Sequence, residues 1–157
     1  MPDLIRLIVA IVACQSAGLL GALTTQTGSS SWYQQLHKPP FNPPGWVFGP
    51  VWTALYLMMA VAAWLVWRQG LSIRPVRVAL VLFAVQLALN AAWTPVFFGM
   101  RSIVGGLVVI VLLLAAIMAT TAAFWPLSRP AAGLMLPYLG WVCFATVLNA
   151  SFVVLNR

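Results

Sequence analysis

The chain has 157 residues, of which 63% are apolar and only 6% are charged, and this composition excludes an ordinary soluble domain. Its net charge of +7 comes from eight Lys and Arg against one acidic residue. These charges lie at or near the ends of apolar runs, which favours membrane lipids as their partners and argues against nucleic acid. With one Asp, no Glu and one His, the sequence lacks carboxylate pairs, metal-binding clusters and a Ser-His-Asp set, so we expect no catalytic residues and no metal site.

The first apolar run covers residues 4–24, about the 20 residues that a helix needs to cross a bilayer. An alternative is a secretory signal, because Arg6 precedes the run, but the run is longer than a usual signal core. Small residues recur along it at spacings that suit close helix packing in lipid, and they are Ala17, Gly18, Gly21 and Ala22. We therefore predict a membrane-spanning helix.

The first loop, residues 25–44, is about twenty residues long, whereas the other loops are short. Long loops are usually lids or binding segments, although a disordered spacer is the alternative. Four prolines stiffen this loop and lower the entropy lost when it becomes ordered. Its aromatic residues also suit anchoring at the membrane interface. The residues predicted to form the lid are Trp32, Tyr33, His37, Lys38, Pro39 and Trp46.

The second and third runs, residues 46–67 and 77–98, each carry polar or aromatic residues on one helical face. In the second run these are Trp52, Tyr56, Met59 and Ala63; in the third they are Gln86, Asn90, Trp93 and Phe97. An amide facing lipid would be costly, so Asn90 is expected either to bind a ligand or to form a hydrogen bond between helices.

The opposite face of the third run holds alanines at four-residue intervals, which are Ala84, Ala88 and Ala92. Small residues repeated in this way let two helix backbones approach closely. We assign this face to a helix partner and predict a homodimer interface. Packing inside a single bundle is the alternative.

The fourth and fifth runs cover residues 102–124 and 130–154, and Trp141, Ala145 and Asn149 share a face of the fifth. A proline lies inside the second, third and fifth runs, at Pro50, Pro95 and Pro137. Each proline removes a backbone donor, and such irregular backbone suits helices that surround a cavity. The expected fold is an all-α membrane protein, a single domain over residues 1–157 that forms a five-transmembrane-helix bundle with the Pro/Trp-rich first loop as a lid.

The basic residues indicate the orientation of the bundle. With five spans, one end carries Arg6, Arg68, Arg74, Arg77 and Arg129, and the other carries Lys38, Arg101 and Arg157. The excess of positive charge predicts a cytoplasmic N-terminus and an outward first loop. No ionisable group lies deep inside a run, which argues against an ion-coupled pump.

Three stretches resemble the TspO/MBR family of translocator proteins, peripheral-type benzodiazepine receptors and tryptophan-rich sensory proteins. They are "WYQQLHKPPFNPPGWVFGPVWTALY" at residues 32–56, "NAAWTPVFFG" at 90–99 and "LPYLGWVCFATVLN" at 136–149. The resemblance covers nearly the whole chain. It implies a five-helix bundle, commonly a dimer, with a pocket under the first loop for tetrapyrroles such as protoporphyrin or haem, for benzodiazepine-type drugs and, in some members, for sterols.

The resemblance carries pocket positions over to Trp52, Asn90 and Trp141, with Ala145 on the pocket wall. Two departures stand out. Ser29, Ser30 and Ser31 occupy a place where many relatives have an acidic residue, which puts a lid contact through that acid in doubt. Ala150 stands where the sterol-associated pattern has Tyr, so sterol is expected to bind weakly if at all.

These residues and the resemblance together predict a receptor or passive carrier in a bacterial cell membrane. It would need no cofactor and would take porphyrin, haem or a drug-like molecule as its ligand. The alternatives are an enzyme that degrades porphyrin with light and oxygen, and a regulatory scaffold protein. The full predicted ligand-binding set is Trp52, Tyr56, Gln86, Asn90, Trp93, Trp141, Ala145 and Asn149.

Overall fold

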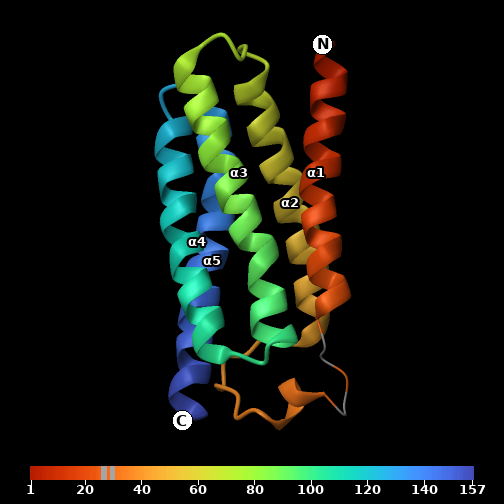
Figure 1. Cartoon of the computed structure of the whole chain (residues 1–157), viewed down its shortest axis with the longest axis vertical. Coiled ribbons are helices and arrows are strands. Elements are labelled where there is room, and N and C mark those ends of the chain that lie inside the picture. Colours follow the sequence, from red (N-terminus) through yellow and green to blue (C-terminus); the bar gives the residue numbers. More distant parts are fainter. Residues whose placement is uncertain (26–27, 29–30) are drawn as a thin grey trace.

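The computed structural model describes residues 1–25, 28 and 31–157 (Figure 1). The described chain contains five long helices: α1 (Asp3–Thr24), α2 (Gly45–Trp67), α3 (Arg74–Thr94), α4 (Ile103–Phe124) and α5 (Arg129–Leu155). Each is long and apolar enough to cross a membrane. The predicted five-helix bundle is confirmed, and the chain is a multi-pass membrane protein.

The helix boundaries follow the expected spans closely, with one main difference at α3. This helix begins at Arg74, three residues before the expected start at 77, because Pro75 falls in its first turn, where no backbone donor is needed. At its other end, Pro95 begins a short π-helical turn, η2 (Pro95–Gly99), as expected for a proline that interrupts the α-helical hydrogen bonds. In contrast, α2 and α5 continue as helices through Pro50 and Pro137.

The five helices form a closed ring. Helix α1 packs against α2 and α3, α2 packs against α5, and α4 packs against both α3 and α5. The order around the ring is therefore α1, α2, α5, α4 and α3, with neighbouring segments of the chain running in opposite directions (Figure 1). As a result, α2, α3 and α5, which carry the predicted ligand-binding residues, can all face the centre.

The alanine face of α3 is exposed on the outside of the ring. Ala84, Ala88 and Ala92 are all exposed, and the neighbouring Val81 and Val85 are exposed as well. Packing within one bundle, the alternative interpretation of these alanines, is therefore wrong for this chain. Contact with a second copy stays a prediction.

The first loop lies across the end of the bundle where α5 ends (Figure 1). It contains a short 3-10 helix, η1 (Trp32–Gln35). The side chain of Asn156 accepts a hydrogen bond from the His37 backbone N–H at 2.8 Å and donates one to the His37 carbonyl at 2.9 Å. This pair of bonds ties the middle of the loop to the end of α5.

We predict that Asn156→Ala loosens the first loop without unfolding the bundle. Each hydrogen bond contributes about 1 kcal/mol, so the loss of two should speed local opening at least tenfold. Hydrogen–deuterium exchange of the His37 amide measures this effect.

The matched control is Gln69→Ala. The Gln69 side chain donates to the Leu127 carbonyl at the opposite end of the bundle, so this variant should leave exchange at His37 unchanged. Unaltered exchange in Asn156→Ala would show that the loop is held by other contacts.

Candidate ligand-binding site

A chain of hydrogen bonds crosses the centre of the bundle and links α2, α3 and α5. The Tyr56 hydroxyl donates to Asn90 Oδ1 at 2.6 Å, and Asn90 Nδ2 donates to the Tyr138 hydroxyl oxygen at 2.7 Å. The Tyr138 hydroxyl in turn donates to Gln86 Oε1 at 2.8 Å. All four side chains are buried, so each bond satisfies a polar group that water cannot reach. We call these four residues the central network.

The central network depends on a small residue in α1. A Cβ atom added at Gly18 would lie 2.6 Å from Cε2 of Tyr56, which is far closer than van der Waals contact. The missing side chain leaves room for the Tyr56 ring between α1 and α2. Gly18 thus has the close-packing role that the small residues of the first run predict, and it positions the hydroxyl that reaches Asn90.

Trp52 and Trp141 meet directly beside the central network. The centroid of the Trp52 ring lies 5.5 Å from that of Tyr56, 6.2 Å from that of Tyr138 and 6.5 Å from that of Trp141. Two of these contacts are edge-on, a favourable arrangement for aromatic rings. Both indoles are only partly buried. The structure therefore brings together Trp52, Tyr56, Asn90 and Trp141, four of the predicted ligand-binding residues.

A row of aromatic rings extends from Trp141 toward the first loop. Phe48 and Phe144 lie 6.1 Å and 5.5 Å from the Trp141 ring, and Phe41 of the loop lies 6.3 Å from Phe144. Ala145, one residue beyond Phe144, is half-buried against the core. Aromatic surface therefore continues from the loop to the central network along the contact between α2 and α5.

The other two predicted residues, Trp93 and Asn149, pair with each other. The Trp93 indole N–H donates to Asn149 Oδ1 at 3.1 Å, and Asn149 Nδ2 donates to the Ile103 carbonyl at 3.0 Å. The Trp93 ring also stacks on Phe97, with centroids 4.9 Å apart. These contacts join α3 and α5 to the first turn of α4, and they occupy the polar groups that a ligand would need.

The loop residues predicted to form a lid pack on the end of the bundle. The Trp32 ring lies 5.7 Å from Phe97, and the Tyr33 ring lies 5.5 Å from Phe98. The Lys38 ammonium lies 4.8 Å from the Tyr33 ring centroid, a favourable cation–π contact. Burial raises the pKa of the Tyr33 hydroxyl, which keeps it neutral.

The remaining lid residues differ in exposure. Pro39 is buried, whereas His37 is exposed apart from its bonded backbone. Trp46 is 76% exposed at the start of α2, which suits the interfacial anchoring that the sequence also indicates for loop aromatics. Where many family members have an acidic residue, this chain has Ser29, Ser30 and Ser31. Ser29 and Ser30 lie outside the described residues.

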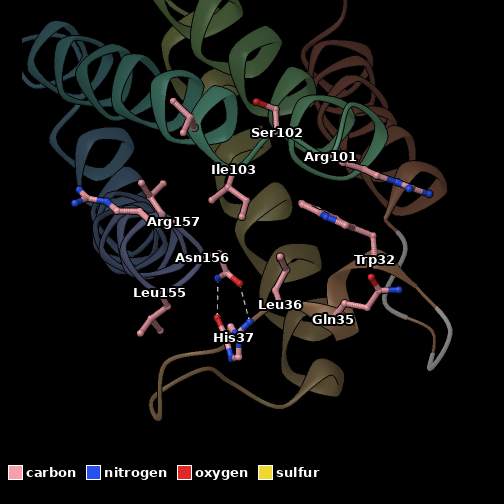
Figure 2. A pocket seen from close by; sticks show the side chains of 12 residues that line it. Trp32, Gln35, Leu36, His37, Arg101, Ser102, Ile103, Leu155, Asn156 and Arg157 are labelled. Atoms are coloured by element: carbon pink, nitrogen blue, oxygen red, sulfur yellow. Dashed lines mark hydrogen bonds between the residues drawn. The ribbon is translucent and has the colours of Figure 1, made fainter.

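A separate groove of about 740 Å³ lies between the first loop, the first turn of α4 and the last turn of α5 (Figure 2). Neither Trp52 nor Trp141 lines it, so it is not the hollow that the sequence predicts among the indoles. Arg101 and Arg157 lie at its edges. The sequence groups these two arginines at one end of the bundle but does not predict a groove between them.

Tyr138 is the site residue that the sequence analysis missed. It touches Trp52 and holds both Asn90 and Gln86. Its position three residues before Trp141 in α5 places it on the same helical face, and this spacing was the available signal. Among the described residues, no three His, Cys, Asp or Glu side chains gather in a way that could hold a metal ion.

Comparison with known proteins supports the resemblance noted in the sequence. The TspO/MBR family profile matches residues 10–155. A tryptophan-rich protein TspO of Chlorobaculum tepidum is 44% identical over 154 residues, which cover 98% of each chain. The translocator protein of Bos taurus is 44% identical over 134 residues, which cover 84% of this chain and 79% of the bovine one. A tryptophan-rich sensory protein of Cereibacter sphaeroides is 40% identical over 146 residues, covering 93% and 88% of the two chains.

We predict that Tyr138→Phe lowers the free energy of unfolding by about 2 kcal/mol, because it leaves Asn90 Nδ2 and Gln86 Oε1 without their buried partner. Denaturant titration of the protein in detergent micelles measures the change. Tyr33→Phe removes a half-buried loop hydroxyl that pairs with Asn42 alone at 3.2–3.3 Å, and it should lower the stability by less, about 1 kcal/mol or below. Equal stability of both variants would mean that the central network contributes little.

Proposed function

Because the chain belongs to the TspO/MBR family, we propose that it is a membrane receptor or passive carrier for planar tetrapyrroles such as protoporphyrin IX or haem. Benzodiazepine-type molecules are further ligands of the same site. The observation that carries this proposal is the meeting of two indoles, Trp52 and Trp141, next to buried hydroxyl and amide groups. Pockets for such ligands are mostly apolar with a few polar groups that fix orientation.

The ligand enters where the two indoles meet edge to face. A flat macrocycle can stack on the face of an indole, which differs from the edge-on contact that Trp52 and Trp141 now make with each other. The row from Trp141 to Phe41 offers aromatic surface along the way from the loop. To admit a macrocycle, Trp52 and Trp141 must separate, and their partial exposure favours this movement over a rearrangement of the fully buried Tyr138.

The polar groups divide into two sets. Asn90 already binds two tyrosine hydroxyls, so in this proposal it fixes the floor of the site and contacts the ligand edge with its remaining N–H. The propionates of a tetrapyrrole point toward the loop, where the His37 side chain is exposed and where the Lys38 ammonium would turn from the Tyr33 ring to meet them. Carboxylates then remain in the polar interface, which avoids the cost of burying charge in lipid.

The first loop acts as the lid in this proposal. It is held at its middle by Asn156 and rests on Phe97 and Phe98 through Trp32 and Tyr33. Between Lys38 and Trp46 it contains four prolines, which limit its conformations and so lower the entropy cost of closing. A stiff loop held by one pair of hydrogen bonds and by ring contacts suits opening and closing as a unit.

The names of the relatives agree with carriage or sensing, since they include translocator and tryptophan-rich sensory proteins. We further propose that two copies associate through the exposed alanine face of α3, because small residues permit close approach of two helices in lipid. The expected location is a bacterial cell membrane.

We predict that Trp52→Ala or Trp141→Ala weakens protoporphyrin IX binding by about tenfold or more, because an aromatic contact contributes roughly 1.4 kcal/mol, which corresponds to that factor. Quenching of tryptophan fluorescence by porphyrin, titrated in detergent, gives the dissociation constant. The matched control is Trp125→Ala, which removes a half-exposed indole at the opposite end of the bundle and should leave the constant within twofold. Wild-type binding in both site variants would refute the proposal.

A second candidate function is the oxidative degradation of the bound porphyrin in light. It is favoured by the closeness of four oxidisable rings, since Tyr56, Tyr138 and Trp141 all lie within 6.5 Å of Trp52. Here light excites the porphyrin, molecular oxygen is the oxidant, and the rings would supply electrons.

We expect illumination of the porphyrin complex in air to bleach the porphyrin absorbance faster than in a complex of porphyrin with serum albumin. Trp52→Phe should slow the decay while keeping an aromatic surface for binding. Decay at the albumin rate would leave only the receptor or carrier function.

A further inference from the structure

Helix α1 contributes none of the predicted ligand-binding residues, although it packs against both α2 and α3. The side of α1 that faces these helices is built from small side chains, since its buried residues are Ala10, Cys14 and Ala17. Gly18 and Gly21 continue this side at helical spacing. The space beside each glycine shows which of the two also affects the ligand site.

Gly18 and Gly21 differ in the room next to them. A Cβ atom at Gly18 would lie 2.6 Å from Cε2 and 2.8 Å from Cδ2 of the Tyr56 ring, far inside the ordinary carbon–carbon contact distance of about 3.5–4.0 Å. At Gly21 the nearest atom of a neighbouring helix would be Thr94 Oγ1 at 3.4 Å. A methyl group at 21 therefore fits almost without change, whereas one at 18 must displace the Tyr56 ring by about 1 Å.

The Tyr56 ring has little freedom to absorb such a displacement. Its hydroxyl donates to Asn90 Oδ1 at 2.6 Å, its centroid lies 5.5 Å from that of the Trp52 ring, and the side chain is buried. Because α1 closes one side of the ring, a methyl group at 18 pushes the ring away from α1 and into the bundle. The shift misaligns the bond to Asn90 and narrows the space beside Trp52.

We propose that Gly18 is a positioning residue that sets the size of the ligand that the site admits; this inference rests on the proposed binding of tetrapyrroles at the two indoles. Gly18 acts through Tyr56 and not through contact with the ligand. It keeps the Tyr56 ring back against α1, which leaves room beside Trp52 for a macrocycle. A benzodiazepine-type molecule is smaller than a tetrapyrrole and needs less of this room, so a narrower site acts first against the macrocycle.

A purely structural role for Gly18 has a different consequence. If the glycine only allowed α1 and α2 to pack closely, an added methyl group would lower the stability of the bundle and weaken all ligands by the same factor. A selective loss of the larger ligand, transmitted by Tyr56, therefore separates the two roles.

The first test compares protoporphyrin IX with diazepam, each titrated against the protein in detergent and followed by tryptophan fluorescence. Gly18→Ala should weaken protoporphyrin IX binding by about fivefold or more, because overpacking a filled space is costly. Diazepam binding should change by less than about twofold. Gly21→Ala makes the same change one turn further along α1 and should leave both dissociation constants within about twofold. Unchanged protoporphyrin binding in Gly18→Ala, or equal weakening of both ligands, would overturn the proposal.

A double-mutant cycle shows whether the effect passes through Tyr56. Tyr56→Leu removes the ring that the methyl group would strike. In that background Gly18→Ala should change protoporphyrin IX binding by less than about twofold. A further loss as large as in the wild-type background would overturn the proposal, because the methyl group would then act by another route.

A third measurement needs no ligand. In Gly18→Ala the side-chain amide NMR signals of Asn90 should move, because its bond to the Tyr56 hydroxyl changes. The signals of Asn149, which pairs with Trp93, should stay in place. Unmoved Asn90 signals would overturn this inference alone, whereas absence of protoporphyrin binding by the wild type would refute the proposed function and remove the site that Gly18 serves.

Discussion

The chain of hydrogen bonds from Tyr56 through Asn90 and Tyr138 to Gln86 is the constraint on which the rest of the structure depends. In a bilayer the helices gain little from hiding apolar surface from one another, because lipid is equally apolar. Buried polar groups without partners, in contrast, are costly. The bonds are satisfied only when α2, α3 and α5 lie at one depth and one rotation. That arrangement also brings the two indoles beside the network into contact.

The two ends of the bundle are closed in different ways. At the N-terminal end, the Trp64 indole N–H donates to the Asp3 carboxylate at 3.1 Å, and Arg68 pairs with the same carboxylate at 3.4 Å. These short contacts join α1 directly to α2. At the other end, a long loop covers the helices and is joined to α5 by the hydrogen bonds of Asn156 and by ring contacts such as that of Phe41 with Phe144. An end closed by a loop can open at a lower local cost than an end closed by direct contacts between helices.

The loop end carries two surfaces of different chemistry. The row of aromatic rings runs from the loop to the central network along α2 and α5, whereas the basic groove lies against α4 and the end of α5. The row of aromatic rings and the groove are therefore separate parts of the same end. Both surfaces include residues of the first loop, so a movement of the loop would change both.

The sequence by itself determined the five spans, the long first loop and the inward faces of α2, α3 and α5, because apolar runs and helical spacing depend only on nearby residues. It also singled out Trp52, Asn90 and Trp141. Only the tertiary structure decided that Trp93 and Asn149 pair with each other, that Tyr138 completes the central network, and that Arg101 and Arg157 flank a groove. Helical spacing tells which residues share a face, but the partner of a polar group depends on the depth and rotation of other helices. Those quantities are fixed by packing between segments far apart in the chain.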